Sequence, residues 1–202
     1  FQGGTLYMGN AAFTLGGSRV LDFSNASGGT VDTTGSSLTL NTSGQLSGAN
    51  KLTKAGANVL ILSAANAGFS GEVNITGGAV RANDGTGINS GSLLTINGGV
   101  FETGANLART GGSSAGNMQI TGGTSGFSAN GGAVQVAFGT LGSPTALTWG
   151  TAPLAPVILN LNAATANNTL EFKNAIGLGA SARTVQVDAS VVTMSGNLTG
   201  TG

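Results

Sequence analysis

The chain has 202 residues and contains neither cysteine nor histidine. Without cysteine it has no disulfide framework, no thiolate metal site and no thiol redox centre. Without histidine, a serine nucleophile would lack its usual base. These two absences predict a protein that holds no cofactor and is not an enzyme.

Charge is also scarce. Seven basic and seven acidic residues, scattered singly, give a net charge of zero. No basic patch is present to neutralise phosphates or to attract the chain to a membrane surface, so we expect no nucleic-acid partner. No apolar run is long enough to span a bilayer, which predicts no membrane span in this segment. A neutral surface does not repel a second copy of the same chain, so self-association is expected.

Proline is almost missing, whereas glycine is abundant. The 37 glycines have no Gly-X-Y period, which excludes collagen, and the 40% of hydrophobic residues argues against disorder. The three prolines, Pro144, Pro153 and Pro156, surround the single tryptophan, Trp149. Because proline removes a backbone hydrogen-bond donor, the segment 142–156 is predicted to be a loop excursion.

Short segments of alternating apolar and polar residues take the place of helical stripes. Such alternation, bounded by Gly, Asn, Ser and Thr, is the signature of a β-strand. The clearest cases are Leu38-x-Leu40, Leu60-x-Leu62, Val73-x-Ile75, Val134-x-Val136-x-Phe138, Leu147-x-Trp149, Leu159-x-Leu161, Leu170-x-Phe172 and Val185-x-Val187. The best helical stretch, 163–167, is too short and too rich in turn formers to stand alone. The pattern predicts an all-β protein.

One phrase returns three times along the chain: Ile75-Thr76-Gly77-Gly78, Ile96-Asn97-Gly98-Gly99 and Ile120-Thr121-Gly122-Gly123. A β-branched residue followed by paired glycines indicates a strand that runs into a turn. The copies are 21 and 24 residues apart, a spacing within the range of one coil of a β-solenoid. Residues 1–202 are therefore predicted to form one continuous parallel β-helix of about nine coils, with these six glycines at its corners.

A longer unit surrounds the first copy of this phrase. Its elements are, in order, Leu46-Ser47-Gly48, Leu52-Thr53-Lys54-Ala55-Gly56-Ala57, Leu60-Ile61-Leu62-Ser63, Ala65-Asn66, Phe69-Ser70-Gly71, Val73-Asn74-Ile75-Thr76-Gly77-Gly78 and Val80. Over residues 46–82 they resemble the autotransporter-associated β-strand repeat, a passenger-type repeat of bacterial surface proteins. Three positions depart from the family pattern: Asn58 and Ala64 replace glycines, and Phe69 stands where tyrosine is common.

The resemblance implies a right-handed parallel β-helix that is exported by a bacterium and displayed at, or released from, its surface. Such proteins are implied to act in adhesion, surface layers or fibres rather than in chemistry. Segments 3–6 and 194–202 resemble the end and the beginning of further repeats. We therefore expect the winding to start and stop within a coil and to continue into other coils, either of a longer chain or of a second copy.

Catalytic patterns have simpler interpretations. Residues 112–116 fit Gly-x-Ser-x-Gly, but that motif needs a strand-to-helix turn and a histidine. Arg81, Glu102 and Arg109 are spaced so that neighbouring coils could bring them together, as in a β-helix enzyme that processes polysaccharides, which is the remote alternative. Opposite charges stacked on a solenoid face are more often a solvated ion pair. The acidic residues are too scattered to predict a calcium site.

Two non-enzymatic functions remain open. One is a structural unit whose uncapped ends stack or polymerise into a filament, fibre or layer, with Leu6 and Leu198 near the subunit contacts. The other is an adhesin that binds a glycan or a host surface through its loops, with Trp149 as a sugar-stacking platform. The alternation Leu147-x-Trp149 favours a core position for the same residue. Threonine arrays for ice binding lack a regular spacing. Both functions predict an extracellular or cell-surface location in a bacterium.

Overall fold

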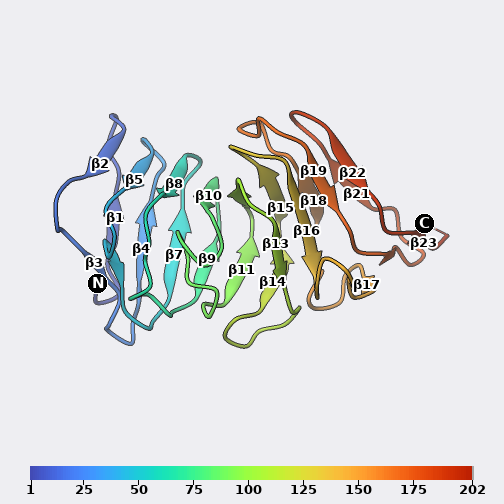
Figure 1. Cartoon of the computed structure of the whole chain (residues 1–202), viewed down its shortest axis with the longest axis horizontal. Coiled ribbons are helices and arrows are strands. Elements are labelled where there is room, and N and C mark those ends of the chain that lie inside the picture. The colour runs from blue at the N-terminus through green and yellow to red at the C-terminus, as the bar shows by residue number, and fades with distance from the viewer. Residues whose placement is uncertain (202) are drawn as a thin grey trace.

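The computed structural model describes residues 1–201, which wind into an all-β parallel solenoid of about eight turns (Figure 1). These residues form 23 strands and no helix. The N-terminal strands lie at one end of the rod and the C-terminal strands at the other (Figure 1). The parallel β-helix expected from the repeated phrase is confirmed, and its right-handed sense stays a prediction.

One wall of the rod is an eight-stranded parallel sheet that takes one strand from each turn. In order, its strands are β2 (Phe13–Leu15), β5 (Leu38–Leu40), β8 (Val59–Leu62), β10 (Ala79–Ala82), β12 (Val100–Thr103), β15 (Thr124–Ala129), β18 (Ile158–Leu161) and β21 (Thr184–Gln186). We call it the long sheet. Strands of consecutive turns therefore lie side by side although about one coil of sequence separates them.

The other walls are built from shorter sheets. A six-stranded sheet contains β1 (Thr5–Tyr7), β4 (Gly29–Asp32), β7 (Leu52–Ala55), β9 (Val73–Ile75), β11 (Leu94–Asn97) and β14 (Met118–Gly122). The remaining strands pair as β3 (Leu21–Asp22) with β6 (Leu46–Ser47), as the series β13 (Leu107–Arg109), β16 (Val134–Phe138), β19 (Leu170–Phe172) and β22 (Val192–Met194), and as the series β17 (Leu147–Thr148), β20 (Ile176–Gly177) and β23 (Leu198–Thr199).

The turns are unequal in length, which corrects the expected nine coils to about eight. Leu60 lies opposite Val80, 20 residues further on, but Phe127 lies opposite Leu161, 34 residues further on. The proline-bearing segment 142–156 falls within this long turn. Within it, the strand expected from the alternation Leu147-x-Trp149 forms β17 and stacks on β20 in the wall of the rod.

Apolar side chains of successive turns stack into columns inside the rod. The longest column follows the long sheet through Phe13, Leu38, Leu60, Val80, Phe101, Phe127 and Leu161. Every member after Phe13 is at most 1% exposed. Burying such side chains stabilises the folded state by roughly 1.5–3 kcal/mol each. A repetitive apolar core thus replaces the cross-links that a chain without cysteine cannot form.

Candidate functional site

The repeated glycine phrase lies where the six-stranded sheet passes into the long sheet. The isoleucines of its three copies are register partners in β9, β11 and β14, so the copies stack in consecutive turns. The third copy is displaced by a bulge that places Asn97 opposite Gly122. Gly122 therefore ends β14, and the turn is made at Gly123, whose φ is +61°.

Close contact between turns explains the glycines of the first two copies. Gly78 has a φ of +59°, and a Cβ on it would lie 2.4 Å from the carbonyl oxygen of Asn58 in the turn below. A Cβ on Gly99 would lie 2.6 Å from Gly78 O. Gly77 and Gly98 lie beside them between the strands. These residues form corners of the coil.

Lys54 is hydrogen-bonded to the same corner from inside the rod. The side chain is fully buried, and Nζ donates hydrogen bonds of 2.9 Å to the carbonyl oxygens of Ala55, Gly56 and Gly77. Burial lowers the pKa of Lys54 to about 8, and the nearby charge of Asp32 opposes that shift. In the sequence Lys54 was part of the repeat pattern, and nothing in the pattern revealed that its ammonium group binds backbone carbonyls.

Large apolar side chains are exposed mainly at the two ends of the rod. In the first turn they are Tyr7, Phe13 and Val20, and in the last turn Val185, Val187, Val191 and Leu198. Among residues 1–201, Val157 is the one other large apolar residue of this kind. The ends therefore present side chains of the type that the middle turns bury.

The inner column of the long sheet reaches both ends. It starts at Phe13, which is 49% exposed. At the other end Val187, which is 47% exposed, follows the last register pair of β18 and β21 and so continues the column past Leu161. The edge strands β2 and β21 each have one partner strand, and their outer edges carry unpaired N–H and C=O groups.

The two leucines predicted near subunit contacts differ in their surroundings. Leu6 lies in β1 opposite Val31 and is partly buried against the core. Leu198 lies in β23 opposite Ile176 and is about half exposed. Leu198 thus belongs to the exposed apolar end, whereas Leu6 mainly completes the core of its own turn.

Trp149 lies in the core, the position that the alternation Leu147-x-Trp149 favours over a glycan platform. Its side chain is 3% exposed, and its Nε1 donates a 2.9 Å hydrogen bond to the carbonyl oxygen of Pro156. The guanidinium of Arg183 lies over the ring, 5.8 Å from its centroid. A buried ring offers no open face to a sugar.

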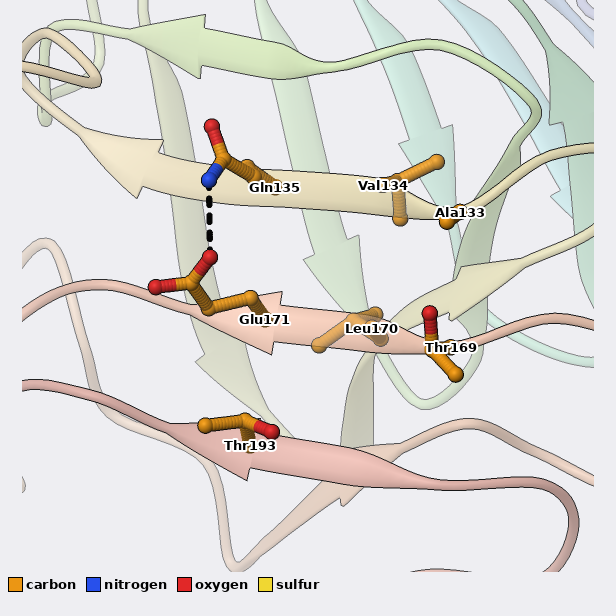
Figure 2. A pocket seen from close by; sticks show the side chains of 7 residues that line it. All are labelled: Ala133, Val134, Gln135, Thr169, Leu170, Glu171 and Thr193. Atoms are coloured by element: carbon orange, nitrogen blue, oxygen red, sulfur yellow. Dashed lines mark hydrogen bonds between the residues drawn. The ribbon is translucent and has the colours of Figure 1, made fainter.

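A hollow of about 340 Å³ lies beside β16, β19 and β22 (Figure 2). Gln135 Nε2 donates a 2.7 Å hydrogen bond to Glu171 Oε2, and Lys173 Nζ lies 3.3 Å from Oε1. Hydrogen bonds from Ser195 and Gln135 lower the pKa of Glu171. Glu171 is the single acid among the lining residues. The hollow therefore lacks the pair of carboxylates that glycoside hydrolysis usually needs.

The charged residues considered for catalysis form two separate ion pairs. Arg81 and Glu102 are register partners on β10 and β12, and Arg81 Nε lies 2.8 Å from Glu102 Oε2. Arg109 instead pairs with Asp84, with 2.5 Å between Nη2 and Oδ1. Residues 1–201 contain no cluster of three or more acidic, cysteine or histidine residues that could hold a metal ion.

Comparisons with known proteins add no relative. No protein-family model, no curated protein and no solved structure matches the chain. Within the part of the chain that the structure describes, no helix is long and apolar enough to cross a membrane. The assignment to the parallel β-solenoids accordingly depends on the strand pairing itself.

Proposed function

We propose that this chain is a structural β-solenoid element whose copies stack end to end into a filament, fibre or layer at a bacterial cell surface. The partner is a second copy of the same chain, and the role is mechanical rather than catalytic. The observation that carries the proposal is that exposed large apolar side chains gather in the first and last turns, with Val157 as the exception within residues 1–201.

The two ends match each other in direction and in chemistry. Strands β2 and β21 are the opposite edges of one parallel sheet, so β2 of a second copy can add to β21 without reversing direction. Phe13 of that copy would then cover Val187 and continue the inner column. Each large side chain buried in this way contributes roughly 1.5–3 kcal/mol. A net charge of zero adds no long-range repulsion between copies.

The extracellular location is supported by the sequence pattern. Residues 46–82 resemble the autotransporter-associated repeat of bacterial surface proteins, and in this structure they form β6 to β10. Lys54 of that unit is fully buried against corner carbonyls. A surface rod also suits a chain whose stability comes from stacked turns, since such a rod can be extended by adding identical units.

Sedimentation velocity and electron microscopy of the purified chain test the proposal. We expect head-to-tail oligomers or filaments that grow with protein concentration. Phe13→Lys and Val187→Lys should each suppress them, because a charge would have to be buried at the joint. Val157→Lys is the control, since it alters an exposed apolar residue that lies outside the first and last turns. A monodisperse monomer at all concentrations, or equal effects of all three variants, would contradict end-to-end stacking.

A further inference from the structure

A second hollow lies on the outer face of the long sheet, where β8, β10, β12 and β15 end. Its volume is about 290 Å³, and its lining includes Arg81, Asn83, Thr86, Gly104 and Asn130. This volume is just below the range for ligand pockets, roughly 300–1,000 Å³. Because four consecutive turns contribute to it, the hollow exists only in the wound chain.

Arg81 presents unused hydrogen-bond donors to this hollow. Its Nε is bonded to Glu102, whose side chain is fully buried and whose other oxygen, Oε1, accepts a hydrogen bond from Thr165. The Nη1 and Nη2 groups of Arg81 make no hydrogen bond with any residue of the range 1–201. The side chain is 31% exposed. Glu102 and Thr165 thus hold the guanidinium in place while its outer edge stays open.

Two amide side chains in the lining each have one of their two polar groups hydrogen-bonded within residues 1–201. Asn83 Oδ1 accepts hydrogen bonds from Thr103 Oγ1 and Gly104 N, which leaves its Nδ2 available as a donor. Asn130 Nδ2 donates to Thr165 O, which leaves its Oδ1 available as an acceptor. The lining contains no acidic residue. The hollow therefore contains one guanidinium group together with neutral hydrogen-bond donors and acceptors.

We propose that this hollow binds an acidic sugar, with the carboxylate of a uronic acid residue on Nη1 and Nη2 of Arg81. Two N–H groups on one edge of a guanidinium can donate parallel hydrogen bonds to the two oxygens of a carboxylate. Sugar hydroxyls both donate and accept, which fits Asn83 and Asn130. Gly104 and Gly131 also line the hollow, and a Cβ on Gly104 would lie 2.9 Å from Asn130 O, so glycine there lets these two turns approach each other closely.

The site lies on the side wall, so it does not compete with the stacking of copies at the ends. A stacked rod would display one such hollow per copy, and repeated sites along a polysaccharide raise the overall avidity. The inference does not depend on stacking, because the isolated chain contains the complete hollow. It assigns glycan binding to a wall of the rod and not to Trp149.

Isothermal titration calorimetry and ¹⁵N–¹H spectra with digalacturonate test this site. We expect binding, with shifts at the Arg81 Nε–H and at the amides of Gly87, Gly104 and Gly131. Arg81→Lys should weaken binding roughly ten- to a hundredfold. A lysine ammonium can keep the ion pair with Glu102, but it lacks the two Nη groups that would bind the carboxylate of the ligand. Arg19→Gln is the control, since it removes one positive charge from an exposed arginine outside the lining.

Three ligands separate a sugar acid from a simple anion. Digalacturonate should bind, its uncharged methyl ester should not, and acetate should bind at least about tenfold more weakly, because it lacks the hydroxyl contacts. Equal binding of acetate would overturn the assignment to a sugar. Unchanged affinity in Arg81→Lys, or no binding of digalacturonate to a folded wild-type chain, would overturn the site. Thermal melting of each variant shows whether it is folded.

Discussion

Lys54 Nζ lies 2.9 Å from the carbonyl oxygen of Gly77, although 23 residues separate the two in the sequence. The bond links one turn of the solenoid to the next at the corner where the glycine phrase stacks. Two further bonds, to Ala55 and Gly56, complete the donors of the ammonium group. A charged group is thus held inside the rod by backbone dipoles, and this arrangement should make stability depend on pH.

The free energy of unfolding should rise with pH between about 8 and 10.5. The pKa of Lys54 is lowered from 10.5 to about 8 in the folded chain, so the unfolded chain binds more protons within this window. Stability then increases with pH by about 3 kcal/mol across it. Urea unfolding at several pH values measures this, and Lys54→Met should lack the increase. If the difference between the two proteins does not change with pH, the expected role of Lys54 is wrong.

Gly78→Ala should destabilise the chain more than Gly85→Ala. Both residues have positive φ, at +59° and +76°, so both substitutions carry a similar backbone cost of roughly 1–2 kcal/mol. A Cβ on Gly78 would also lie 2.4 Å from Asn58 O, whereas a Cβ on Gly85 meets open space. We expect an additional loss of roughly 2 kcal/mol at Gly78. Thermal and urea unfolding check it, and equal losses would argue against tight corner stacking.

Removing Arg109 should cost far more stability than removing Lys51. Arg109 is 4% exposed, binds both carboxylate oxygens of Asp84 and also donates to the carbonyls of Ser92 and Asn89. Arg109→Met would leave a carboxylate without its partner, at a cost of about 3–5 kcal/mol. Lys51→Met breaks an exposed pair and should cost at most about 1 kcal/mol. The free energies of unfolding from urea titrations decide this, and comparable losses would refute it.

Trp149 should fluoresce as a buried indole. Its ring is 3% exposed and its Nε1 is bonded to Pro156 O, so the emission should be blue-shifted and protected from acrylamide. Unfolding in urea should shift the emission to the red and remove the protection. Trp149→Phe should lower stability by about 1 kcal/mol or more, because the Pro156 carbonyl loses its donor. Emission like that of free tryptophan in the native chain would show that the ring is accessible.

Local pattern was sufficient to locate the strands in which apolar and polar residues alternate. The alternations at Leu38, Leu60, Val73 and Leu170 form β5, β8, β9 and β19, because a period of two places every second side chain in the core regardless of the partner strand. The stacking of the glycine phrase was also predictable, because the spacing between its copies equals one turn. The number of turns was not predictable from the sequence, because the 34-residue turn from Phe127 to Leu161 depends on how the proline-bearing segment packs.

The sequence by itself determined that this chain winds, where its corners lie and that Arg81 and Glu102 are neighbours, since their 21-residue separation equals one coil. Tertiary structure alone decided how these residues are surrounded. Thr165, 63 residues beyond Glu102, folds back over the sheet and bonds to the carboxylate, so a pair expected to be solvated has a fully buried carboxylate and a partly exposed arginine. Spacing fixes contacts between adjacent turns, but burial depends on loops that return from distant turns.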